Sequence, residues 1–172
     1  MTRGLAEDVI LRDRDVNRLY WLVARQFNLL LRNVSLSREM GVDIELALIY
    51  LQISRVIERV GDHVVKVAES IRSLMYTSLE KRMIDLIEIK SRESLDIFEG
   101  SLESFFEKDI VKANTRISDV REFVEKCNDV SGWLFDLGVS GVVSIGYCVE
   151  NFRRVGGICR CDLGECDQLS GQ

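Results

Sequence analysis

The chain has 172 residues, of which 47% are hydrophobic and 30% charged, a balance typical of a folded globular protein and not of a disordered one. It contains no proline, which disfavours a sandwich or barrel with many turns and favours long helices joined by short connections. The net charge of -5, with basic residues scattered along the chain, argues against a surface that binds nucleic acid by neutralising phosphates.

The first predicted helix spans about residues 7–33. Apolar side chains recur there with alternating steps of three and four residues, which is the spacing of a helix-packing stripe. The members of this stripe are Val9, Val16, Tyr20, Val23, Phe27, Leu30 and Val34. Asp13 stands at the one position where the pattern requires an apolar residue. Residues 34–42, with two serines and Gly41, are predicted to form the turn that follows.

The second predicted helix spans about residues 43–76, with Asp43 as its N-cap. Its main apolar stripe consists of Leu46, Ile49, Ile53, Ile57, Val60, Val64, Val67, Ile71 and Leu74. A second stripe lies beside it and consists of Leu51, Ser54, Glu58, Gly61 or Asp62, and Val65. A helix with two such stripes contacts neighbours on more than one side, so we expect it to be central.

Three more helices are predicted in the second half of the chain, over residues 79–108, 111–128 and 133–158. Ser131 and Gly132 are interpreted as a turn, and glycines at 138, 141 and 146 leave the start of the last helix open. Residues 159–172 have no apolar period and are predicted to be an extended or disordered tail. The fold class is therefore all-α, an antiparallel bundle of about five long helices.

The first two helices bring four oxygen-bearing side chains together. In an antiparallel hairpin that turns near residues 37 and 38, Asp13 lies opposite Asp62, and Asn17 lies opposite Glu58 in the same register. Each helix carries its two residues at i, i+4, which places them on one face. Carboxylates among apolar neighbours are costly unless they are paired or bind a cation. This pattern predicts a metal site.

The chemistry of these donors indicates the kind of metal, although an alternative stays open. Oxygen donors without sulfur suit magnesium, manganese, iron or zinc, and His63 follows directly as a possible additional ligand. The nearby arginines can instead convert the same acids into ion pairs on a solvated face. These arginines are Arg14, Arg18, Arg55 and Arg59.

At these residues the sequence resembles the PhoU family. RDRDVNRLYWLVARQ, residues 12–26, and RVIERVGDHVVKVAES, residues 55–70, are similar to the two signature helices of that family. In PhoU proteins an acidic residue with Asp or Asn nearby in each signature helix supplies metal ligands. The resemblance thus implies the metal ligands Asp13, Asn17, Glu58 and Asp62, with iron, zinc, manganese or magnesium as the metal.

The family is built from tandem three-helix units, which implies a division of this chain. Residues 1–77 correspond to a first unit that lacks the opening helix, 78–158 to a degenerate second unit, and 159–172 to a cysteine-containing tail. This pattern resembles a divergent, truncated member of archaeal type. The DNA-binding domain that precedes some archaeal relatives has no counterpart here, so direct nucleic-acid binding is not expected. The missing helix leaves an apolar face that we expect a homo-oligomer to cover.

The second unit is predicted to have lost its metal site. Aligning residues 152–157 with 57–62 places Arg153 and Gly157 at the positions of Glu58 and Asp62. In the partner helix, Ile117 and Arg121 occupy the positions of Asp13 and Asn17. Since an arginine cannot ligate a metal, we expect no second site.

The resemblance implies a regulator of phosphate uptake that is not an enzyme. Such proteins restrain phosphate import by acting on the phosphate ABC transporter or its sensor. The alternative is a metal-free helical interaction or oligomerisation module of the same descent. A carboxylate-bridged metalloenzyme is disfavoured because the sequence offers no matching set of histidines or acid–base residues.

The location is predicted to be cytoplasmic, without membrane insertion. Acidic residues stand where a signal peptide has its apolar core, and no stretch approaches the ~18 apolar residues of a membrane span. The five cysteines are an odd number and do not suggest a secreted disulfide framework. Cys159, Cys161 and Cys166 form a candidate thiol metal site, although their spacing lacks a CxxC pair and reduced thiols are the favoured interpretation.

Overall fold

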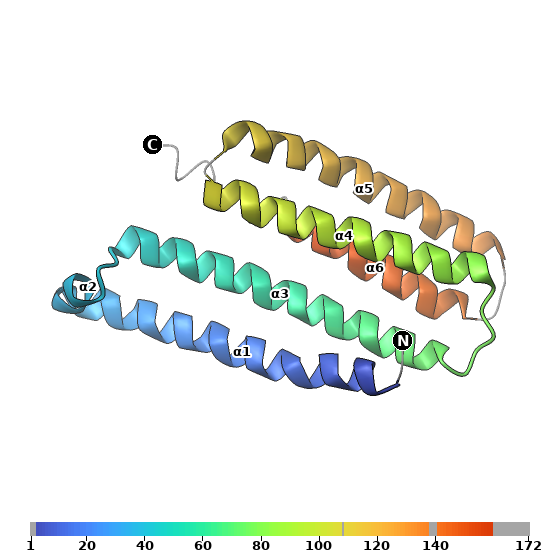
Figure 1. The fold of residues 1–172 in the computed structure, drawn as a ribbon, viewed down its shortest axis with the longest axis horizontal. Coiled ribbons are helices and arrows are strands. Elements are labelled where there is room, and N and C mark those ends of the chain that lie inside the picture. The colour runs from blue at the N-terminus through green and yellow to red at the C-terminus, as the bar shows by residue number, and fades with distance from the viewer. Residues whose placement is uncertain (1–2, 108, 138–140, 160–172) are drawn as a thin grey trace.

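The structure is a computed structural model that describes residues 3–107, 109–137 and 141–159. Within these ranges the chain forms six helices and no strand. They are α1 (Arg3–Arg32), α2 (Val34–Met40), α3 (Ile44–Leu74), α4 (Lys81–Glu107), α5 (Ile110–Leu137) and α6 (Val142–Ile158). The five long helices lie alongside one another, and each runs antiparallel to the next long helix in the chain (Figure 1). The predicted all-α bundle is therefore confirmed.

The helices are arranged so that α3 and α6 lie inside and α1 and α5 at opposite edges (Figure 1). α1 packs mainly against α3, and α3 packs against α6. α4, α5 and α6 all contact one another. The helix predicted over residues 43–76 therefore has two long neighbours, α1 and α6, as its two stripes indicated. The prediction that this helix is central is correct.

The segment between α1 and α3 is a short helix, and the prediction of a simple turn over residues 34–42 was wrong. The Asn33 side chain caps this helix by accepting a hydrogen bond from the Ser35 amide at 3.1 Å. Gly41 ends it in the left-handed conformation, with φ of 64°. Asp43 then caps α3 as predicted, since its Oδ1 accepts from the Leu46 amide at 2.7 Å. The two caps, Asn33 and Gly41, lie eight positions apart and enclose a helix of seven residues.

The predicted turn at Ser131 and Gly132 is also absent, because α5 continues through both residues to Leu137. The Ser131 hydroxyl donates to the Cys127 carbonyl at 2.9 Å, and Leu134 is buried one turn later. Burial of Leu134 outweighs the weak helix propensity of the Ser-Gly pair. The actual break precedes α6, which begins after Gly141 with φ of 83°.

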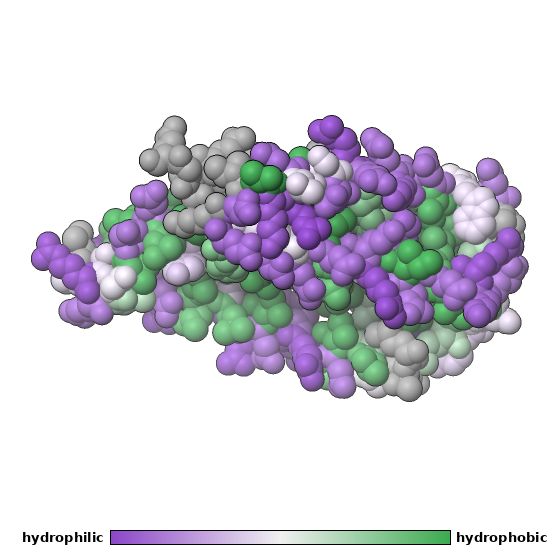
Figure 2. Space-filling view, turned by 45° about the horizontal axis from the view of Figure 1, so that its top comes forward, coloured by the Kyte–Doolittle hydropathy of each residue, from purple (hydrophilic) through white to green (hydrophobic). Residues whose placement is uncertain are grey.

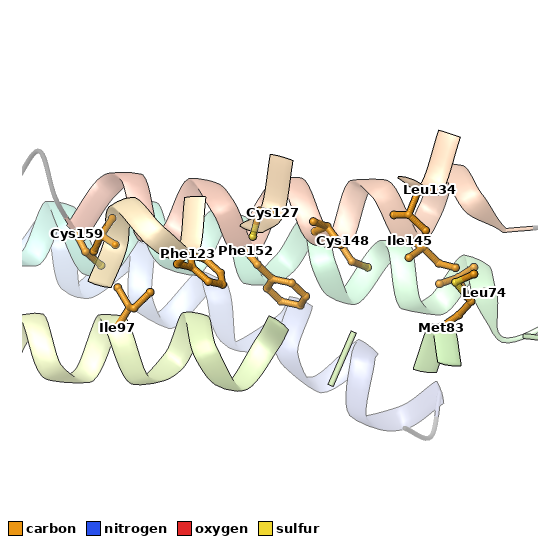
Figure 3. Packing of buried hydrophobic residues seen from close by; sticks show 12 residues of the cluster. Leu74, Met83, Ile97, Phe123, Cys127, Leu134, Ile145, Cys148, Phe152 and Cys159 are labelled. Carbon is orange, nitrogen blue, oxygen red and sulfur yellow. The ribbon is translucent and has the colours of Figure 1, made fainter. Parts of the chain in front are cut away.

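Two clusters of buried side chains form the core. The larger lies mainly among α4, α5 and α6 and includes Ile97, Phe123, Phe152 and three cysteines (Figure 3). The smaller joins α3 to the ends of α4 and α6. Its members are Ile53, Val56, Val60, Phe105, Val155 and Ile158. Because both clusters include residues of α6, this helix links the two halves of the chain.

Hydrophobic side chains also reach the surface. Figure 2 shows them in several places between hydrophilic residues. On α1, the exposed large hydrophobic residues are Leu5, Leu11, Leu19, Trp21, Leu22, Leu29 and Leu31. Such exposure follows from the edge position of α1, which has one long neighbour in the described part of the chain. Across the described ranges, every helix is too short or too polar to cross a bilayer.

Two glycine substitutions test these local assignments. Gly132 lies inside α5 with open space where a Cβ would stand, so Gly132→Ala should stabilise the fold by about 0.5–1 kcal/mol. The expected rise in Tm is about 1–4 °C by calorimetry. Gly41→Ala is the matched control, since φ of 64° disfavours alanine and should lower Tm. A lower Tm for Gly132→Ala would contradict a continuous α5.

Candidate functional site

α1 and α3 are in direct contact at Gly61. A Cβ built on Gly61 would lie 3.4 Å from Asp13 Oδ1 and 3.6 Å from Val16 Cγ1. The helix backbone of α3 therefore faces α1 directly at this level. This register places Asp13 opposite residue 61, within one residue of the predicted pairing with Asp62.

Asp13 is the central residue of this crossing. Its Oδ2 accepts a hydrogen bond from Asn17 Nδ2 at 2.8 Å, one helical turn later on α1. Its Oδ1 is buried and has no hydrogen-bond partner among the described residues. A buried acceptor without a partner costs about 1–3 kcal/mol, and more when it carries charge. The site therefore favours a positively charged group beside this oxygen.

Glu58 experiences the same environment from the α3 side. Desolvation raises its pKa above the ordinary value, and the negative charges of Asp62 and Asp13 raise it further. Arg55 and Arg59 act in the opposite direction but do not outweigh these effects. The acids on the two helices thus interact unfavourably with each other, which is the electrostatic setting that a bound cation would relieve.

The four predicted ligands are brought to one level of the hairpin, but they do not form a closed cluster. Asp13 and Asn17 are in direct contact, whereas Asp62 is exposed to solvent. Among the described residues, no three of His, Cys, Asp and Glu lie close enough together to hold a metal ion.

His63 forms its hydrogen bond with an asparagine of α6 and not with these acids. Its Nδ1 lies 2.8 Å from Asn151 Oδ1, and Asn151 Nδ2 donates to the Tyr147 carbonyl at 2.7 Å. Because that carbonyl can only accept, Asn151 presents its oxygen to His63, and Nδ1 carries the proton. Burial is the main cause that lowers the pKa of His63. His63 therefore joins α3 to α6, a role that the sequence analysis missed because Asn151 lies 88 residues away.

The second half of the chain contains a similar helix crossing with different chemistry. A Cβ on Gly156 of α6 would lie 3.1 Å from Phe123 Cδ1 and 3.8 Å from Val120 Cγ1 of α5. Arg153 donates to Glu150 on its own helix through Nε at 2.7 Å. At this crossing the side chain nearest to the glycine is an aromatic ring, whereas at Gly61 it is a carboxylate.

Comparison with protein families identifies the hairpin. The sequence model of the PhoU domain matches residues 1–71. This part of the chain is a PhoU domain. The match covers α1, α2 and nearly all of α3, and it contains Asp13, Asn17, Glu58 and Asp62. Searches among curated proteins and solved structures gave no match. A PhoU domain over these residues supports a phosphate-related regulatory role.

One cysteine of the candidate thiol site lies in the core of the bundle. Cys159 belongs to the buried core cluster and is 3% exposed, so it is not the start of an extended tail. Cys161 and Cys166 lie outside the described residues. Cys127 and Cys148 are buried, and desolvation raises the pKa of each thiol to about 11. A raised pKa keeps these two thiols protonated and poorly nucleophilic.

The thiol environment can be tested by alkylation. In the native protein at pH 8, Cys127 and Cys148 should react with iodoacetamide far more slowly than in guanidinium, because burial suppresses both thiolate formation and access. Mass spectrometry of digested protein locates the labels. Equal labelling of Cys127 in native and unfolded protein would show that its site is open.

Proposed function

We propose that this PhoU protein is a non-enzymatic, cytoplasmic regulator of phosphate uptake that binds a metal ion or cluster. The ligands are Asp13, Asn17, Glu58 and Asp62, and the metal is iron, zinc, manganese or magnesium. The regulator acts through protein–protein contacts with the phosphate ABC transporter or its sensor, and it forms a homo-oligomer. The PhoU domain supports the phosphate-related part of this proposal.

One observation carries the metal part of the proposal. Asp13 Oδ1 is buried against Gly61 without a hydrogen-bond donor among the described residues. A carboxylate oxygen in this position is costly in the apo protein, whereas it is a good ligand for a hard cation. Asn17 holds the other oxygen of the carboxylate and thereby orients it.

The charges around Asp13 also fit a cation. The pKa of Glu58 is raised by desolvation and by two neighbouring carboxylates, which are effects that a nearby cation would oppose. A bound metal would connect α1 to α3 at the level of Asp13 and Gly61. Such a link supplies stability and, through open coordination positions, affinity for phosphate oxygens.

A metal-free helical interaction module is the second candidate. It is favoured by the absence of a three-member group of His, Cys, Asp or Glu in the described ranges. In this case Glu58 takes up a proton or pairs with Arg55 and Arg59, and the hairpin acts only as a docking element. The two candidates differ in whether stability depends on metal.

Elemental analysis of the purified protein distinguishes them. We expect about one or two metal ions per chain in the wild type and at least a tenfold loss in the double variant Glu58→Gln, Asp62→Asn. The matched control is Glu125→Gln, Asp129→Asn on α5, because this pair has the same spacing and both residues are exposed. The control should retain the metal content of the wild type.

Thermal unfolding with and without a chelator provides the second measurement. Chelation should lower the Tm of the wild type and of the control, and it should leave the Tm of the site variant unchanged. Equal metal content in all three proteins, or a wild-type Tm that the chelator does not change, would favour the metal-free module.

A further inference from the structure

A cavity of about 330 Å³ opens between the C-terminal half of α5 and the N-terminal half of α6. Within the described ranges, its walls come from these two helices alone. The walls are mostly apolar and include Leu134, Val142, Val143 and Tyr147, with open space at Gly146. Ser131 and Glu150 add polar groups. Because the Ser131 hydroxyl is bonded within its own helix, Glu150 forms the polar end of the cavity.

Two arginines lie at the end of the cavity that contains Glu150. Arg153 donates to the Glu150 carboxylate through Nε at 2.7 Å and through Nη2 at 2.8 Å. Arg154 donates to the same carboxylate through Nε at 2.8 Å. Both arginines follow Glu150 by about one helical turn, so their side chains fold back toward the cavity. One carboxylate therefore holds two guanidinium groups at the rim of an apolar cavity.

This arrangement leaves positive charge and hydrogen-bond donors available to a ligand. The hydrogen bond from Arg153 is the main cause that lowers the pKa of Glu150, so this carboxylate stays ionised at neutral pH. Two guanidinium groups against one carboxylate leave a surplus positive charge. Each guanidinium has five N–H groups, of which Arg153 uses two on Glu150 and Arg154 uses one. The other N–H groups have the planar geometry that matches phosphate oxygens.

The neighbouring helix α5 adds a third arginine. In the alignment of the two halves of the chain, Arg153 on α6 stands at the position of Glu58 on α3. Arg121 on α5 stands at the position of Asn17 on α1, so Arg121 and Arg153 lie on one edge of the α5–α6 pair. Arg121 makes no ion pair within the described ranges. A Cβ on Gly157 would meet no atom within 4 Å, so this edge is open.

The spacing of the cavity and the arginines fits one small molecule. Gly146 lines the cavity four residues before Glu150, which is about 6 Å along the helix. An aromatic ring in the cavity would thus be separated from a phosphate on the arginines by about the length of a sugar. The cavity volume falls in the range of small-molecule sites, and Tyr147 is 62% exposed, so its ring is available for stacking.

We propose that this cavity and the arginines at its rim bind a phosphate monoester with an aromatic group, such as a nucleotide. The aromatic group lies in the cavity against Tyr147, and the phosphate accepts hydrogen bonds from Arg121, Arg153 and Arg154. A phosphate monoester suits these cations because it carries about two negative charges at neutral pH. The site lies outside residues 1–71, which match the PhoU domain, so the proposal does not depend on the metal site.

Isothermal titration calorimetry at one fixed ionic strength tests the proposal with AMP, inorganic phosphate and adenosine as probes. AMP should bind at least about tenfold more tightly than either fragment, because it occupies both parts of the site. The double variant Arg153→Gln, Arg154→Gln should weaken AMP binding at least about tenfold through the loss of charge-assisted hydrogen bonds. Tyr147→Ala should weaken the binding of AMP and leave that of inorganic phosphate unchanged.

The matched control is Arg92→Gln on α4. Arg92 also pairs with a glutamate on its own helix, since its Nη2 lies 2.7 Å from Glu88 Oε1. It lines the groove beside α3 and not this cavity, so the control should bind AMP like the wild type. The metal-site variant Glu58→Gln, Asp62→Asn should also bind AMP like the wild type. Failure of the nucleotide site and failure of the metal site are therefore distinguishable.

Three outcomes would overturn the proposal. The first is a wild-type chain that binds no AMP at concentrations up to about 10 mM. The second is an arginine double variant that binds AMP as tightly as the control does. The third is inorganic phosphate that binds as tightly as AMP, which would remove the cavity from the site. Circular dichroism of equal intensity in all variants shows that a loss of binding is not a loss of fold.

Discussion

The structure depends on the close approach of α1 and α3 at Gly61. A Cβ at Gly61 would lie at ordinary van der Waals distance from Asp13 Oδ1 and Val16 Cγ1, so the two helices are in direct contact at this point. The same contact encloses one oxygen of Asp13. Helix packing and a buried, unpaired carboxylate oxygen therefore occur at one point of the hairpin.

At Gly156, as at Gly61, a glycine inside a helix contacts side chains of the neighbouring helix, but the nearest side chain is aromatic and not acidic. There the ring of Phe123 lies over the glycine, and the charged groups of Arg153 and Glu150 pair along their own helix. An aromatic ring at this point needs no counter-charge and adds to the buried core. Of the two glycine crossings in the described residues, the one in the PhoU domain has a carboxylate as its nearest neighbour on the facing helix.

The PhoU hairpin carries the proposed metal ligands on both of its long helices. In the proposed function, a metal bound to them would connect α1 to α3. The His63–Asn151 contact then fixes this hairpin to α6 and so to the second half of the chain.

Sequence alone determined the features that depend on local spacing. Apolar periodicity predicted the five long helices, and the antiparallel register predicted that Asp13 lies near residues 61 and 62. Tertiary structure decided the features that depend on distant partners: the continuation of α5 past Ser131, the burial of Cys159, and the pairing of His63 with Asn151. The physical reason is that periodicity records which side of a helix is apolar, but not which neighbour covers it.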